Sequence, residues 1–162
     1  MAARVPVVVG VSDAKASGQP EHTLVTYSLG SCIGVTLYDP ITHIGGMLHY
    51  QLPSSSADPQ RAAEKPLMFA DTGMAWLLNK MTAMGANKKR LRVRMAGAAQ
   101  MLDDNKLFDI GRRNHASIRK ILFSHGLFID SEHVGGKIPR TLHLNVADGS
   151  VTIKSNNEVI SL

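Results

Sequence analysis

The fold of this chain is decided by residues 29–49, which have the sequence LGSCIGVTLYDPITHIGGMLH. Apolar residues alternate with small or polar ones on both sides of Asp39 and Pro40. Asp at the first position and Pro at the second are typical of a type I turn. The pattern therefore predicts two antiparallel strands, at 32–38 and 44–51, joined by a turn at residues 39–42.

The register of this hairpin brings a thiol next to an imidazole. If the strands pair without a bulge around a turn at 39–42, Cys32 lies directly opposite His49. Opposed residues point to the same face, with Cβ atoms about 4.5–5.5 Å apart, which predicts a hydrogen-bonded pair. Cys32 shares that face with Gly34 and other small residues, and we expect them to leave room for a substrate. A bulge at Gly45 and Gly46 would instead turn His49 away.

Cys32 is the only cysteine of the chain. A thiol of ordinary pKa, near 8.5, is only a few per cent thiolate at pH 7. A neighbouring His49 imidazolium would stabilise the thiolate and later protonate a leaving group. Gly30 and Gly34 flank the cysteine, so that backbone N–H groups near Ser31 could hold an oxyanion. We expect a cysteine hydrolase; the alternative is that the cysteine packs as a small core residue.

The rest of the sequence predicts a strand-rich domain with two main helices. Helices are expected at 66–85 and 111–124, and further strands at 4–13, 24–27, 89–95, 127–134, 141–146 and 150–154. The predicted class is α+β, a layered sandwich of mixed or antiparallel β-sheets with the two helices packed on the outside. The 162 residues are expected to form one domain, with residues 1–4 and 155–162 as flexible ends.

Composition excludes several other classes of function. The net charge is +5 and the sequence pI is about 9.6, but aromatic stacking partners and a helix-turn-helix pattern are absent, so we expect no nucleic acid. The basic run at 88–94 alternates with apolar residues, which indicates a half-buried strand with a solvated basic face, or a surface for an acidic protein partner. Asp103 and Asp104 are expected in a solvated loop, and no metal or cofactor is expected.

The sequence also predicts where the chain is located. No stretch approaches the roughly 20 apolar residues of a membrane span, and residues 1–10 do not resemble a secretory signal. A free thiol survives in a reducing compartment. We therefore expect a cytoplasmic protein that does not insert into membranes.

These motifs resemble those of the CheD family, the bacterial chemoreceptor glutamine deamidases. The resemblance is carried by residues 29–35, 37–40, 45–49 and 52–53, and it continues at 69–74, 110–114, 134–136 and 140–141. It implies a cysteine-dependent protein-glutamine glutaminase of bacterial chemotaxis, which hydrolyses glutamine side chains of methyl-accepting chemoreceptors to glutamate and ammonia. It also implies an α/β sandwich fold.

The resemblance implies roles for three residues. The catalytic Cys and His of the family fall on Cys32 and His49, and a third catalytic residue, a Thr, falls on Thr26. The implied partners are chemoreceptor cytoplasmic helices as substrate and a CheC-type phosphatase as regulator. Two alternatives are a non-catalytic module that binds receptors or CheC, and a receptor methylesterase. Pro139 stands where the family commonly has Gly, and residues 96–99 are less glycine-rich than expected; both could alter docking.

Overall fold

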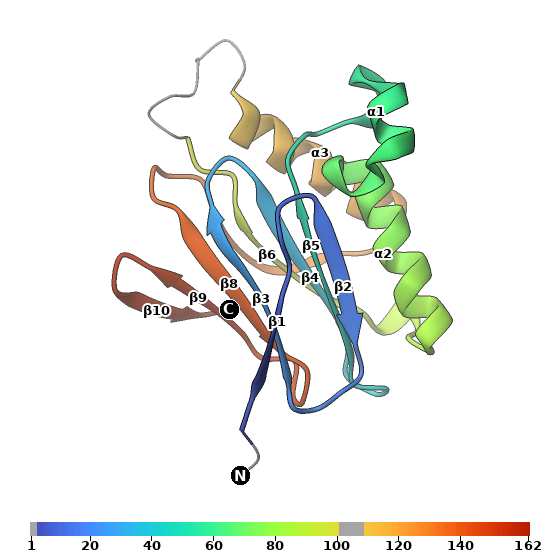
Figure 1. Cartoon of the computed structure of the whole chain (residues 1–162), viewed down its shortest axis with the longest axis vertical. Coiled ribbons are helices and arrows are strands. Elements are labelled where there is room, and N and C mark those ends of the chain that lie inside the picture. The colour runs from blue at the N-terminus through green and yellow to red at the C-terminus, as the bar shows by residue number, and fades with distance from the viewer. Residues whose placement is uncertain (1–2, 101–108) are drawn as a thin grey trace.

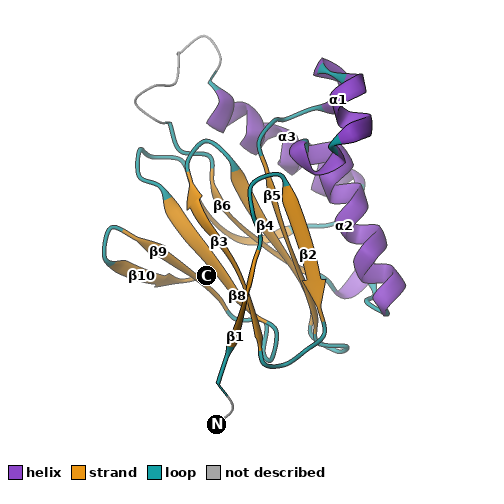
Figure 2. Cartoon of the chain, in the orientation of Figure 1, coloured by secondary structure: helices purple, strands orange, loops and turns teal. Residues whose placement is uncertain are grey.

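Two β-sheets and a layer of helices stack on one another in the computed structural model, which describes residues 3–100 and 109–162 (Figure 1). The outer sheet has the strand order β1-β3-β8-β9-β10, and the central sheet has the order β2-β5-β4-β6-β7. The helices cover the face of the central sheet that lies away from the outer sheet (Figure 2). Asp103 and Asp104 lie outside the described residues.

The strands are β1 (Val5–Val8), β2 (Asp13–Ser17), β3 (His22–Leu29), β4 (Ile33–Asp39), β5 (Ile44–Tyr50), β6 (Arg92–Gly97), β7 (Ile129–Val134), β8 (Arg140–Asn145), β9 (Val151–Ser155) and β10 (Glu158–Ser161). The helices are α1 (Pro59–Glu64), α2 (Ala70–Met84) and α3 (Ile110–Ser124), with short 3-10 turns η1 (Ser55–Ala57), η2 (Pro66–Met68) and η3 (Lys88–Arg90). β1 pairs with β3 and β6 with β7 in parallel, while the other pairs are antiparallel. The prediction of an α+β fold with mixed sheets is confirmed.

Two hydrophobic clusters hold the three layers together. Buried residues of β4 and β5 that face the helices pack with α2 and α3, among them Val35, Leu48, Met74, Leu77 and Ile118. Residues of the opposite face of β4 and β5 pack against the outer sheet, among them Tyr38, Met47, Leu142, Leu144 and Ile153. Because successive residues of a strand point to opposite faces, β4 and β5 are buried on both sides. The central hairpin is thus the core of the molecule.

The register of this hairpin differs from the predicted one by two residues. Gly34, and not Cys32, lies opposite His49, and the pairing runs without a bulge from Ile33↔Tyr50 to Asp39↔Ile44. The connection is a loop of residues 40–43, in which the His43 N–H donates to the Asp39 carbonyl at 2.9 Å. His43 has the left-handed φ of 58° at the end of this loop. The predicted turn at residues 39–42 is therefore wrong, and the loop lies one residue later.

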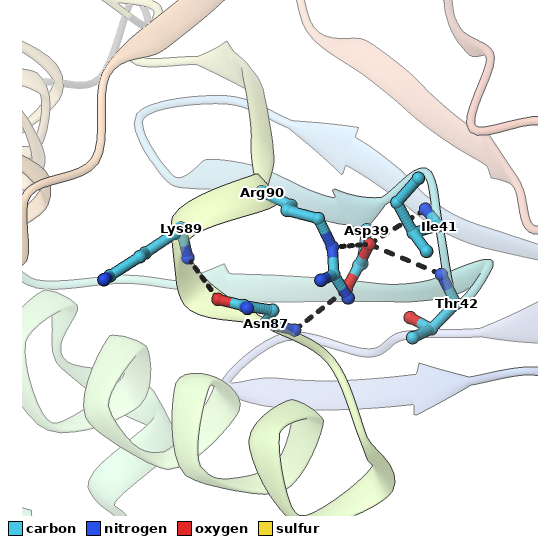
Figure 3. A network of polar contacts seen from close by, with 6 residues as sticks. All are labelled: Asp39, Ile41, Thr42, Asn87, Lys89 and Arg90. Carbon is cyan, nitrogen blue, oxygen red and sulfur yellow. Dashed lines mark hydrogen bonds and ion pairs between the residues drawn. The ribbon is translucent and has the colours of Figure 1, made fainter.

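The Asp39 carboxylate holds this loop in place (Figure 3). Its Oδ1 accepts from the Ile41 N–H at 2.9 Å and its Oδ2 from the Asn87 N–H at 2.8 Å. The Arg90 guanidinium donates to both oxygens, at 3.0 and 2.8 Å. These donors hold the pKa of the buried carboxyl well below its usual range, with Arg90 as the largest cause. Part of the basic run therefore forms an ion pair, and Lys88–Arg90 is a 3-10 turn before β6 and not part of a strand.

Several short elements lie where the sequence predicted none. β2 begins at Asp13, the last residue of the first predicted strand, and runs to Ser17, where no strand was predicted. β10 lies within residues 155–162, which were expected to be a flexible end, and pairs with β9. β6 extends to Gly97, into the expected loop at 96–99. Helix α2 begins at Ala70, after the 3-10 turn at Pro66, and ends at Gly85 with φ 113°, as expected for a C-terminal glycine. In the described part of the chain, no helix has the length and apolarity to cross a membrane.

Candidate active site

A hydrogen bond between the two sheets lies at the centre of the candidate site. Thr26 on β3 belongs to the outer sheet and His49 on β5 to the central sheet, and both are almost fully buried. The Thr26 Oγ1 lies 2.7 Å from the His49 Nδ1. The structure therefore brings together two of the three residues that the resemblance singled out, although they are 23 positions apart in the sequence.

The same threonine determines which imidazole nitrogen carries the proton. Thr26 Oγ1 also donates to the Val9 carbonyl at 2.7 Å, and a carbonyl can only accept. A hydroxyl has a single proton, so Thr26 must accept from an Nδ1–H of His49. The His49 Nε2 then carries the lone pair, and it is buried without a hydrogen-bond partner among the described residues. The imidazole thus offers a free proton acceptor.

Cys32 lies diagonally across the hairpin from His49. It immediately precedes β4, and residue 34 is the one directly opposite His49. The shift of two residues keeps both side chains on the same face because the side-chain period of a strand is two. Diagonal neighbours are about 7–8 Å apart at Cα. The predicted direct opposition is wrong, and no hydrogen bond joins thiol and imidazole in the described structure.

Gly34 lets the two sheets approach each other beside the site. A Cβ on Gly34 would lie 2.8 Å from the Leu142 Cδ2, 3.1 Å from the Leu29 Cδ1 and 3.4 Å from the Thr26 Cγ2. These three side chains belong to the outer sheet. The space above Gly34 is therefore filled by the protein, and the expectation that this face leaves room for a substrate is wrong. The glycine instead allows Thr26 to reach His49.

Burial keeps both reactive groups neutral. It raises the pKa of the half-buried Cys32 thiol, while a backbone hydrogen bond at Cys32 acts in the opposite sense. Burial also lowers the pKa of His49 to about 4, opposed by the charge of Asp13, its neighbour on β2. At neutral pH the resting site thus holds a thiol and an imidazole, and not the thiolate and imidazolium expected from the sequence.

The loop before Cys32 is held through its carbonyl groups. The Gly30 carbonyl accepts from the Ala99 N–H at 2.8 Å, and the Cys32 carbonyl from the Ala98 N–H at 2.9 Å. The Ser31 carbonyl accepts from the Asn114 Nδ2 at 3.0 Å. Within residues 3–100 and 109–162, the N–H groups of Ser31 and Cys32 donate to no backbone carbonyl.

Sequence reasoning from spacing missed three contributors to this site: Val9, Asp13 and Asn114. Val9 directly follows β1 and Asp13 begins β2, and no local pattern connects either of them with His49. Asn114 lies in the motif at residues 110–114, on which the family resemblance partly rests, but the sequence assigned no role to this residue. No group of three or more His, Cys, Asp or Glu side chains suited to a metal occurs among the described residues.

Comparisons with known proteins find similar sequences over most of the chain. The family described as CheD chemotactic sensory transduction matches residues 51–155, which begin after His49. The chain is 46% identical to the probable chemoreceptor glutamine deamidase CheD of Solibacter usitatus, over 94% of this chain and 90% of that protein. It is 42% identical to probable chemoreceptor glutamine deamidase CheD 2 of Anaeromyxobacter dehalogenans, over 96% of this chain and 98% of that protein. With CheD 1 of Syntrophus aciditrophicus, the identity is 43% over 93% and 94% of the two chains.

Proposed function

The chain belongs to the CheD family, and from this premise we propose that it deamidates glutamine side chains of methyl-accepting chemoreceptors with Cys32 as nucleophile. The relatives that resemble it over most of its length are named probable chemoreceptor glutamine deamidases. One structural observation supports the chemistry most strongly: the Thr26 hydroxyl holds the His49 Nδ1–H and leaves Nε2 unprotonated, as a base on the hairpin face that Cys32 shares. The reaction needs no cofactor.

The neutral resting state dictates the order of proton transfers. His49 Nε2 accepts the thiol proton as the Cys32 sulfur attacks the carboxamide carbon of the glutamine. The resulting imidazolium then donates this proton to the nitrogen as the carbon–nitrogen bond breaks, and ammonia leaves. A thioester remains. His49 next accepts a proton from water, which attacks the thioester; glutamate is released and the proton returns to the sulfur.

Backbone N–H groups of the loop at residues 30–32 stabilise the oxyanion in this mechanism. Those of Ser31 and Cys32 are the proposed donors, since they bond to no backbone carbonyl of the described chain. Gly30 belongs to this loop, while Gly34 on β4 permits the close approach of the outer sheet. Preorganised donors of this kind are worth about 10²–10³ in rate each.

The partners and the location belong to the same proposal. The substrate is a cytoplasmic helix of a chemoreceptor, and the chain acts in the cytoplasm. A CheC-type phosphatase is the proposed regulator. Phe123 and Phe128, at the end of α3 and before β7, are 74% and 72% exposed and flank a cavity of about 410 Å³. Large exposed apolar side chains next to one another are typical of protein-binding surfaces.

Mass spectrometry of a receptor fragment tests the proposal. The wild-type chain and Cys32→Ala are incubated with a receptor cytoplasmic fragment, and peptides are examined for conversion of glutamine to glutamate. We expect conversion by the wild type and none by Cys32→Ala. Equal conversion by both would exclude the nucleophile, and binding without conversion by the wild type would favour a non-catalytic regulator. Hydrolysis of methyl-glutamate but not of glutamine would identify a methylesterase.

A further inference from the structure

One side chain other than Thr26, Cys32 and His49 connects the segment next to the thiol with the segment next to the imidazole. Asn114 lies on the first turns of α3 and is fully buried. Its Nδ2 donates to the Ser31 carbonyl at 3.0 Å and to the Gln51 carbonyl at 2.9 Å. Ser31 is the residue before Cys32, and Gln51 is two residues after His49. A single amide group therefore bonds to the chain just before β4 and just after β5.

The orientation of this amide follows from chemistry. Both partners are carbonyl oxygens, which only accept, so the NH₂ group of Asn114 must face them. The opposite atom, Oδ1, is buried and has no hydrogen-bond partner among the described residues. An unsatisfied buried polar atom typically costs about 1–3 kcal/mol. The position of Asn114 thus satisfies the two donor bonds of its Nδ2, while its Oδ1 is left without a donor.

Helix α3 is itself seated firmly against this region. Tyr50 follows His49 in β5, and its hydroxyl donates to the Asn114 carbonyl at 2.7 Å. Gly111 lies so close to the chain after β6 that an added Cβ would be 2.8 Å from the Ala98 carbonyl oxygen. The Ala98 N–H in turn donates to the Cys32 carbonyl. Helix α3 is therefore anchored to β5, which carries His49, and to the segment after β6 that bonds to Cys32.

We propose that Asn114 is a positioning residue that orients the Cys32 N–H as an oxyanion donor. The inference rests on the proposed glutamine deamidation. The Ser31 carbonyl and the Cys32 N–H belong to one trans peptide, in which they point in opposite directions. The bond from Asn114 to the carbonyl therefore fixes the direction of the N–H. The second bond, to Gln51, ties β5 to the same amide, so neither strand can shift alone.

Two variants of Asn114 test this role, with a control on the same helix. In Asn114→Ala and the larger, apolar Asn114→Leu, both donor bonds are lost. We expect kcat for receptor deamidation to fall about 10²-fold, as for loss of one oxyanion donor, and KM to change little. Alkylation of Cys32 by iodoacetamide has no oxyanion intermediate, so its rate should stay within about threefold of wild type. The control is Ser117→Ala, which removes the bond from Ser117 Oγ to the Pro53 carbonyl at 2.5 Å.

The outcomes separate this inference from the function on which it rests. If the wild-type chain deamidates no receptor fragment, the proposed function fails. If the wild type is active and a folded Asn114 variant keeps kcat within about twofold, or loses no more than Ser117→Ala does, the inference is overturned. A loss of kcat with an equal loss in the alkylation rate would also contradict it, because the variant would then have perturbed the thiol itself.

Discussion

The hydroxyl of Thr26 offers the sharpest test of how the site works. Thr26→Val keeps the shape of the side chain and its β-branching, but removes the group that bonds both the Val9 carbonyl and the His49 Nδ1–H. Both partners are then buried and unsatisfied. Without the hydroxyl, no hydrogen bond holds the imidazole proton on Nδ1, so the proton can move to Nε2. That tautomer no longer offers Nε2 as an acceptor for the Cys32 proton.

The expected magnitudes follow from these two bonds. Each buried polar group left without a partner costs about 1–3 kcal/mol, so the loss of both bonds should lower the free energy of unfolding by about 2–6 kcal/mol. General base catalysis contributes about 10²–10⁴ in rate, so kcat should fall by at least about 10²-fold. Urea denaturation measures the first effect and release of ammonia from a receptor fragment the second. Thr26→Ser retains the hydroxyl and should keep most of the activity.

A matched control is available three residues away on the same strand. Thr23 Oγ1 donates to the Asn145 Oδ1 at 2.8 Å and accepts from the Arg4 Nε at 2.9 Å, whereas the His49 Nδ1 bonds to Thr26. Thr23→Val should cost stability by about 1 kcal/mol and leave kcat unchanged. The reasoning would be refuted if Thr26→Val were folded and as active as Thr23→Val, because the orientation of the His49 imidazole would then not depend on the hydroxyl.

Three further predictions concern the packing and titration of the site. Gly34→Ala should destabilise the chain by about 1–3 kcal/mol and lower kcat, because its methyl group would lie 2.8 Å from the Leu142 Cδ2; unchanged urea midpoints would contradict the close packing of the sheets. Asp39→Asn should lower the free energy of unfolding by about 2 kcal/mol at pH 7, since it breaks the pair with Arg90. Because the pKa of Asp39 is depressed in the folded state, the stability that it adds is present above pH about 4 and is lost on further acidification, so wild type and variant should converge there. The His49 pKa of about 4 lies below the ordinary value of about 6.5, so its contribution is full above pH 6.5 and falls between pH 6.5 and 4; His49→Gln should show a shallower loss of stability across that window, and an identical loss would exclude a buried neutral imidazole.

The sequence predicted the central hairpin and its faces because alternation is a local property. Cys32 shares a face with His49, as expected, while Val35 and Leu48 lie on the opposite face, toward the helices. The register was wrong by two residues because it depends on the loop, and the loop depends on Asp39. That carboxylate is held by Arg90, 51 positions later in the chain. No local pattern in residues 39–43 could show such a bond.

The parts of the site that spacing did not predict also depend on contacts between residues far apart in the sequence. The bond from Thr26 to His49 crosses from one sheet to the other, so it follows from the way in which the sheets pack. Spacing gave no reason to connect them, and only the resemblance to CheD brought Thr26 to notice. The short strands β2 and β10 were missed because their sequences, DAKAS and EVIS, lack long apolar alternation. Asp13 on β2 reaches His49 through that unpredicted strand.

Titration of activity against the free thiol tests the central claim most directly. Cys32 is the only cysteine, so the fraction of chain alkylated by iodoacetamide, measured by intact mass, is the fraction with Cys32 blocked. The rate of glutamine-to-glutamate conversion in a receptor fragment is measured on the same samples. If Cys32 is the nucleophile, the remaining activity falls linearly with the remaining free thiol and reaches zero at complete alkylation. A fully alkylated chain that still converts glutamine to glutamate would contradict the account.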